Sequence, residues 1–144
     1  MTKNLCRLAI AGGLSCFVSL GSLSYARESP VKVEQLLQTS GAWDGTGYSA
    51  YPVGQPQITV LKITVPANTA LAWHRHPMIS AAYVVSGELF LEKKDTGEHM
   101  TFHAGQALTE TVNTVHRGYT KEQPVELIVF YAGSPGMPLS IKTD

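Results

Sequence analysis

The stretch LAWHRHPMISAAYVVSGELFLE, residues 71–92, carries the pattern that decides the fold. It contains two short runs rich in apolar residues, AAYVV and ELFLE, on either side of Gly87. Runs of this length, rich in β-branched and aromatic residues and bounded by turn residues, are typical of β-strands. His74 and His76 lie just before them, one residue apart. The stretch therefore predicts strands with a pair of imidazoles beside them.

The rest of the chain continues this pattern of short apolar runs separated by turn residues. Pro66-Ala67-Asn68 and Asp95-Thr96-Gly97 have the composition of turns. The only helix that we expect is short, at 33–38. The expected strands lie at 58–65, 71–76, 81–85, 88–92, 100–103, 107–112, 116–119 and 125–131. About eight strands in about 75 residues predict an all-β sandwich or barrel.

His74 and His76 share a direction if they lie on a strand, because residues i and i+2 project from the same face. Two neutral imidazoles side by side are a common start to a metal site. Exposed His-x-His pairs are about as frequent, so the pair alone leaves both interpretations open. His116 shifts the balance, because it begins an expected strand that a barrel can bring next to the pair.

Together these positions resemble the cupin family of small jelly-roll barrels. The first cupin motif, G-x5-H-x-H-x3,4-E-x6-G, is matched at His74, His76 and Gly87. The second motif, G-x5-P-x-G-x2-H-x3-N, is matched at Gly105 and His116. The resemblance implies a single jelly-roll β-barrel with a divalent metal ion held by the three histidines.

The chain also departs from both motifs. Asn68 stands where the first motif has its leading glycine, and Thr111, Asn113 and Thr120 replace the proline, glycine and asparagine of the second. The most important departure is Ser80, which occupies the position of the family's glutamate ligand. A serine hydroxyl is a poor ligand for a divalent cation at neutral pH.

Three interpretations of the missing acid remain open. In the first, the three histidines hold the metal alone, as in some iron-dependent dioxygenases of the family. In the second, Glu110 supplies the carboxylate, because strand alternation places it on the apolar face of 107–112 and a buried carboxylate is costly unless it is paired or bound to metal. In the third, the metal site has decayed and the barrel only binds. Glu110 is therefore the candidate fourth metal ligand and the candidate catalytic residue.

Two classes of function follow from the resemblance, which covers roughly residues 57–131. The first is a metal-dependent enzyme, dioxygenase- or isomerase-like, in which iron, manganese, nickel or zinc acts on a small molecule. The second is a non-catalytic cupin of the cell envelope that binds a small molecule or a metal. Because exposed edge strands favour pairing and many cupins are dimers, we also expect a symmetric homodimer.

The first 26 residues predict a signal peptide rather than part of the barrel. Lys3 and Arg7 give a basic start, an apolar stretch follows at 8–23, and Ser24-Tyr25-Ala26 has the spacing of a cleavage site. Cleavage after Ala26 would leave a single cupin domain at 27–144, in the periplasm or outside the cell. The apolar stretch is short for a membrane span.

Whether the leader is cleaved determines the cysteine content and net charge of the mature chain. A retained anchor and lipid attachment at Cys16 are the alternatives to cleavage. Cleavage would remove Cys6 and Cys16, so the mature domain would have no thiol and no disulfide. It would also leave nine basic and eleven acidic side chains, a net charge of −2 with neutral histidines. This balance argues against nucleic acid or an anionic membrane surface as a partner.

Overall fold

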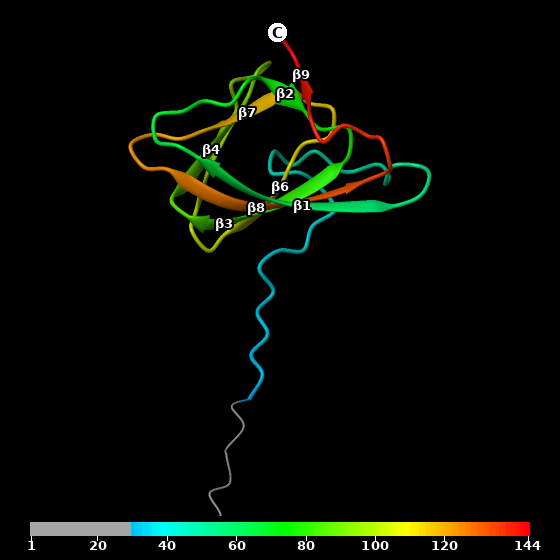
Figure 1. Cartoon of the computed structure of the whole chain (residues 1–144), viewed down its shortest axis with the longest axis horizontal. Coiled ribbons are helices and arrows are strands. Elements are labelled where there is room, and N and C mark those ends of the chain that lie inside the picture. Colours follow the sequence, from blue (N-terminus) through cyan, green and yellow to red (C-terminus); the bar gives the residue numbers. More distant parts are fainter. Residues whose placement is uncertain (1–29) are drawn as a thin grey trace, which may run out of the picture. The chain divides into compact units, whose positions relative to one another are not determined.

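The computed structural model describes residues 30–144, which contain nine strands and no helix (Figure 1). The predicted signal peptide lies outside the described residues. No element in the described part has the length and apolar character of a membrane-spanning helix. The strands are β1 (Gln57–Val65), β2 (His74–Arg75), β3 (Ile79–Ser86), β4 (Glu88–Lys93), β5 (His99–His103), β6 (Ala107–Thr109), β7 (His116–Tyr119), β8 (Val125–Gly133) and β9 (Ile141–Lys142).

The strands form two antiparallel sheets within the compact unit Glu34–Asp144. One sheet has four strands in the order β1-β8-β3-β6, and the other has five in the order β5-β4-β7-β2-β9. Figure 1 shows β1, β8 and β3 in one layer and β2, β7, β4 and β9 in the layer that faces it. The predicted all-β architecture is thus confirmed.

Four details of the secondary structure differ from the sequence prediction, one of which is that the strand expected at 107–112 ends at Thr109. The helix expected at 33–38 is wrong, because this segment has no regular structure and Val33, Leu36 and Leu37 are exposed. A six-residue helix with no surface to pack against cannot repay the cost of nucleation. The strand expected at 71–76 is reduced to β2, and β9, which pairs with β2, was not anticipated.

The apolar core fills only part of the space between the sheets. Alternate residues of each strand point inward, as a period of two requires. The buried apolar side chains include Val84, Leu89, Leu91, Leu108, Val125, Leu127 and Val129. Burial of one such side chain contributes about 1.5–3 kcal/mol. At one end of the inner faces this apolar pattern gives way to polar side chains, and the candidate site lies there.

Gly87 connects the two layers, because β3 and β4 belong to different sheets. Its φ is +78°, and a Cβ atom at this position would lie 2.1 Å from the carbonyl oxygen of Pro124. Only glycine avoids both the left-handed strain and this clash. The glycine that closes the first motif therefore allows the chain to cross between the sheets.

Residues 41–48 form a small loop that attaches to the end of β6. The Trp43 amide donates to the Thr109 carbonyl at 3.0 Å, and the Tyr48 hydroxyl donates to the Glu110 carbonyl at 2.6 Å. Trp43 is itself buried in the core. The 41–48 loop thereby fixes the backbone at the point where Glu110 leaves the strand.

Candidate metal centre

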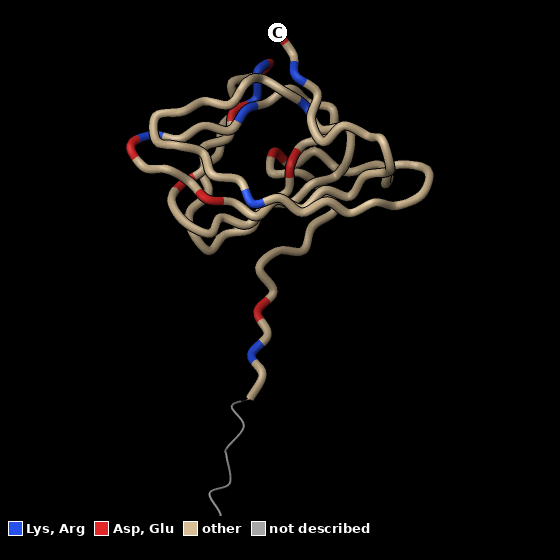
Figure 2. The backbone as a smooth tube through the Cα atoms, viewed as in Figure 1, with Lys and Arg blue, Asp and Glu red and all other residues tan. Residues whose placement is uncertain are grey.

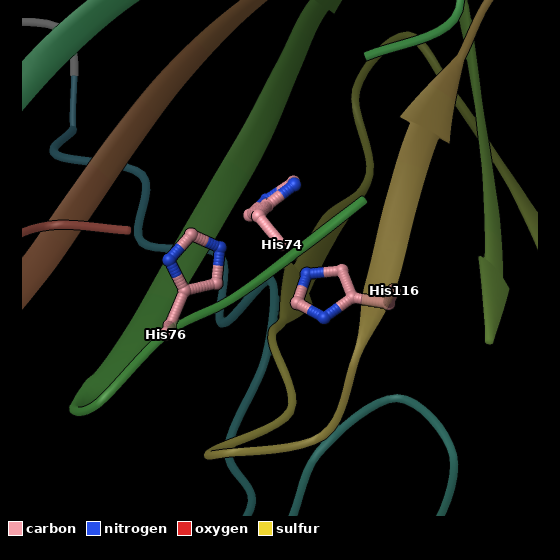
Figure 3. A group of neighbouring side chains, drawn as sticks. All are labelled: His74, His76 and His116. Atoms are coloured by element: carbon pink, nitrogen blue, oxygen red, sulfur yellow. The ribbon is translucent and has the colours of Figure 1, made fainter. Parts of the chain in front are cut away.

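The three histidines converge because of the strand register. His74 on β2 is the direct cross-strand partner of His116 on β7, and His76 follows His74 on the same face. The three pairs of ring centroids are 4.8, 4.9 and 5.1 Å apart, so the rings form a nearly regular triangle. Figure 3 shows the three rings gathered around a common space. One ligand nitrogen from each ring lies within 4.8 Å of the others, so the group can hold a metal ion.

Backbone carbonyls determine which nitrogen of each ring carries the proton. Nδ1 of His74 lies 2.8 Å from the Ala72 carbonyl, and Nδ1 of His76 lies 2.7 Å from that of Leu139. Nδ1 of His116 lies 2.9 Å from the Thr114 carbonyl. A carbonyl oxygen can only accept, so each Nδ1 must donate. In a neutral ring this leaves the lone pair on Nε2, the arrangement that protein partners impose on metal-binding histidines.

Glu110 brings a fourth acceptor to the same space. Its Oε2 lies 3.1 Å from Nε2 of His116, and the two residues are 8% and 0% exposed. Neither atom has a hydrogen-bond partner elsewhere among the described residues, so a proton on Nε2 of His116 or a bound cation is what can pair the two. Two buried acceptors that face each other repel unless a proton or a cation lies between them. The donor set thus fits a divalent cation.

Glu110 reaches the interior from the strand next to the expected position. It follows β6 directly, and its amide donates to the Ser80 carbonyl at 2.9 Å. Ser80 is fully buried on β3. The carboxylate therefore enters the same region of the barrel as a side chain at Ser80 would, but from the neighbouring strand, as strand alternation predicted.

Burial keeps His74 and His76 neutral. Desolvation lowers the pKa of both rings below the usual value, and it outweighs the opposing effects of the carbonyl hydrogen bonds and of the Glu110 charge. A neutral imidazole is the form that binds metal. These two rings could therefore take up a cation at neutral pH without first losing a proton.

His116 and Glu110 behave as a coupled pair in the absence of metal. Burial alone would lower the pKa of His116, but the Glu110 carboxylate raises it above its usual value. Burial alone would raise the pKa of Glu110, but His116 and then the other two histidines lower it. Each group thus stabilises the charged form of the other. A metal ion at this place would take over the role of the His116 proton.

Tyr131 is a site residue that sequence reasoning missed, and it lies beside Ser80, which the sequence marked only as the position of the absent acid. They are cross-strand partners on the inner face of the four-stranded sheet, where Tyr131 is 6% exposed. The Tyr131 ring centroid lies 5.6 Å from that of His76. Burial, with a further contribution from the Glu110 charge, raises the pKa of Tyr131 to about 12, so the phenol keeps its proton. The alternation Val125, Leu127, Val129, Tyr131 was the signal that could have revealed it.

The remaining histidines lie away from the centre. His99 and His103 are exposed on β5. Nδ1 of His103 lies 2.9 Å from Oε1 of Glu88 on the surface. Arg75 points away from the paired histidines and donates to Oδ1 of Asn113 at 2.8 Å. Successive residues of a strand project to opposite faces, which accounts for this separation.

A buried ion pair borders the site on the other side of His116. Lys93 is the cross-strand partner of His116, and its Nζ lies 2.9 Å from Oδ2 of Asp44 in the 41–48 loop. Burial alone would raise the pKa of Asp44, but hydrogen bonds from Thr46 and Lys93 lower it below its usual value. Figure 2 shows that Lys, Arg, Asp and Glu residues are interspersed along residues 34–144, so the Lys93–Asp44 pair is one of several charged positions.

Comparison with known proteins agrees with this architecture. The family model described as "Cupin domain" matches residues 61–131. This segment includes the three histidines, Ser80 and Glu110. The chain belongs to the cupin superfamily. No curated protein sequence matches it significantly.

Solved structures share the fold at low sequence identity. The DMSP lyase DddQ from Ruegeria pomeroyi is 16% identical, with a TM-score of 0.53 over 60% of this chain and 43% of its own. The polyketide cyclase RemF from Streptomyces resistomycificus is 19% identical, with a TM-score of 0.53 over 60% and 61%. The oxalate decarboxylase from Lactobacillus farciminis is 14% identical, with a TM-score of 0.51 over 59% and 26%. This chain thus matches less than two thirds of the length of each of these proteins.

Proposed function

We propose that the protein is a metal-dependent cupin enzyme that acts on a small molecule. The divalent ion is held by His74, His76, His116 and Glu110. Iron, manganese, nickel and zinc all accept three imidazoles and one carboxylate, so the donor set agrees with each of them. The fold neighbours named above are a lyase, a cyclase and a decarboxylase, which supports an enzyme rather than a storage protein.

One observation carries the proposal. Three Nε2 lone pairs and one carboxylate oxygen converge in a buried space, and hydrogen bonds to backbone carbonyls prevent the imidazoles from turning their N–H groups inward. The burial of these acceptors costs desolvation free energy, which a bound cation would compensate. Decay of a metal site would be expected to remove this combination of acceptors rather than to retain it.

Each group of the site has a separate role in the proposed chemistry. When bound, the metal supplies Lewis acidity or oxygen activation. The carbonyls of Ala72, Leu139 and Thr114 orient the imidazoles. Glu110 adds a negative charge, and the carboxylate oxygen that does not bind the ion is the atom able to accept a proton during turnover. Because this carboxylate and His116 are almost completely buried, bulk water has little access to the reacting atoms.

Export and association are part of the same proposal. The basic start, the apolar stretch and Ser24-Tyr25-Ala26 support a secreted or periplasmic protein that begins at Arg27. β1 is an edge strand of nine residues that pairs only with β8 in the described structure. Ile58, Val60 and Phe130 are exposed on the outer face beside this edge. A symmetric homodimer would cover this edge and these apolar side chains.

The test is metal analysis of the protein isolated from its native compartment, followed by titration of the metal-free protein. We expect one equivalent of a divalent ion. His74→Ala, His76→Ala and His116→Ala should each weaken binding at least tenfold, because each removes one ligand. His103→Ala, on the surface, is the matched control and should bind as the parent does. Parent-like affinity in the His116 variant would refute the site. A metal-loaded protein without turnover on any small molecule would favour the non-catalytic alternative.

A further inference from the structure

Three polar side chains form a row across the inner face of the four-stranded sheet. Glu110 neighbours Ser80 through the Glu110 amide to Ser80 carbonyl hydrogen bond, and Ser80 is the cross-strand partner of Tyr131. Directly opposite residues have Cβ atoms about 4.5–5.5 Å apart, so the three side chains stand next to one another. Their exposed fractions are 8%, 0% and 6%. The polar row thus lies inside the barrel.

The polar row faces the three histidines. Glu110 approaches His116 to 3.1 Å, and the Tyr131 ring lies against the ring of His76 with centroids 5.6 Å apart. The histidines come from the five-stranded sheet, whereas the polar row comes from the four-stranded sheet. A molecule bound between them would therefore have the histidine ligands on one side and two hydroxyl groups on the other.

The Ser80 hydroxyl lacks a partner within the protein. Its Oγ is completely buried and makes no hydrogen bond to any residue in the described part of the chain. An unpaired buried hydroxyl costs about 1–3 kcal/mol, so such groups normally have a partner. The carbonyls of Ala72, Leu139 and Thr114 already accept from the Nδ1 atoms of the three rings, and Ser80 Oγ makes no hydrogen bond to its neighbour Tyr131. The partner that Ser80 lacks is therefore an acceptor that enters with a ligand.

The charge of the site indicates what kind of acceptor this is. A divalent ion with three neutral imidazoles and the Glu110 carboxylate leaves one uncompensated positive charge. A buried net charge is costly, and one further anionic group would neutralise it. A hydroxyl donates a stronger hydrogen bond to an anionic oxygen than to a neutral one.

We infer that Ser80 and Tyr131 form the recognition element for a small carboxylate substrate at the metal centre. This inference rests on the proposed metal site and names the substrate class for it. The carboxylate supplies the missing negative charge and accepts hydrogen bonds from the Ser80 and Tyr131 hydroxyls. The absence of an acid at Ser80 thus has a function, because a glutamate there would place a second negative charge where the substrate carboxylate binds.

A cavity lies near the Tyr131 end of the polar row. It has a volume of about 230 Å³ and is lined by Thr59, Met78, Met137 and Leu139, among others. Thr59 is the cross-strand partner of Tyr131, and Leu139 is the residue whose carbonyl orients His76. The cavity therefore lies one residue away from Tyr131 and from His76, and none of its lining residues belongs to the polar row. Its volume suits a ligand of a few heavy atoms.

The experiment uses acetate as the probe and cobalt(II) as a spectroscopically visible metal. The full-length protein is loaded with cobalt(II), and acetate is titrated while the visible absorption is followed. We expect Ser80→Ala and Tyr131→Phe each to weaken acetate binding about tenfold to a hundredfold, the effect of one hydrogen bond to a charged group. Cobalt affinity should stay within about threefold of the parent, because neither hydroxyl is a metal ligand.

Matched controls come from the same sheet. Ser86→Ala and Tyr83→Phe remove the same atoms from exposed positions on β3 and should bind acetate as the parent does. Acetamide provides a test that needs no variant, since it has nearly the shape of acetate without its charge. We expect the parent to bind it at least tenfold more weakly than acetate.

The outcomes separate this inference from the proposed function. If the parent does not bind cobalt, the metal site is wrong and the inference falls with it. If the parent binds cobalt but Ser80→Ala and Tyr131→Phe bind acetate as tightly as it does, the metal site stands and the inference is overturned. Equal affinity for acetate and acetamide would overturn it in the same way.

Discussion

Replacement of Glu110 by glutamine is the most direct test of whether Glu110 supplies the carboxylate ligand of the metal site. Glu110→Gln keeps the size of the side chain and removes its charge. The glutamine amide can donate to the Nε2 lone pair of His116, which lies 3.1 Å from Oε2 in the parent. The metal-free variant should therefore fold normally, with a melting temperature close to that of the parent.

The expected loss in metal affinity can be estimated from the burial of the site. A pair of unit charges about 4 Å apart contributes about 4 kcal/mol at an effective dielectric constant of about 20, and a divalent ion doubles this to about 8 kcal/mol. Desolvation of a carboxylate as buried as Glu110, which is 8% exposed, offsets several kcal/mol of that attraction. A net loss of about 3 kcal/mol remains, which corresponds to roughly a hundredfold in Kd.

The assay is competition for zinc or cobalt against a chelator of known affinity, with parent and variant measured side by side. Ser80→Glu in the Glu110→Gln background should restore part of the lost affinity, because it returns a carboxylate from the adjacent strand. If Glu110→Gln binds metal as the parent does, Glu110 is not a ligand. The three histidines would then hold the ion alone, and any effect of the variant would be on turnover.

Three further predictions concern the rest of the molecule. Asp44→Asn should lower the free energy of unfolding by about 2 kcal/mol at pH 7, because the largely buried Lys93 charge loses its shorter contact and keeps only the more exposed Glu98, 3.4 Å away. The pKa of Asp44 is held below its usual 3.8, so the stability difference between parent and variant should be complete above pH 3.8. It should vanish as the pH falls through the lowered pKa. A difference in urea denaturation that persists in stronger acid would contradict the ion pair. An intact mass measured after export should correspond to a chain that begins at Arg27, and a mature species that retains Met1 would exclude cleavage. Light scattering should give the mass of a dimer, and a monomer at micromolar concentration would count against association.

The fold was predictable from the sequence because its strands carry a local signal. The runs around Gly87 alternate with turn residues, and the structure has strands at β3 and β4 on either side of it. The expected strand at 116–119 coincides with β7. The helix expected at 33–38 failed because its short apolar periodicity has no surface to pack against, which only the tertiary structure reveals.

Strand alternation predicted which side chains of one strand share a face, and only that part of the candidate site was predictable. Alternation placed His74 beside His76 and placed Glu110 on the inner face, and the structure brings these side chains together with His116. It does not reveal which strands are neighbours. Alternation with Val125, Leu127 and Val129 marks Tyr131 as inward-facing, but its contact with the histidines depends on how the sheets pair and face each other.

The residues that support the site extend beyond the segment that the family model matches. The carbonyl that orients His76 belongs to Leu139, and the hydroxyl that holds the Glu110 backbone belongs to Tyr48. Both lie outside residues 61–131. A fragment trimmed to the matched segment would keep every candidate ligand but lose one ring's orienting partner and the anchor of the carboxylate strand. Fragments made for metal binding or crystallisation therefore need to start before the 41–48 loop and continue beyond Leu139.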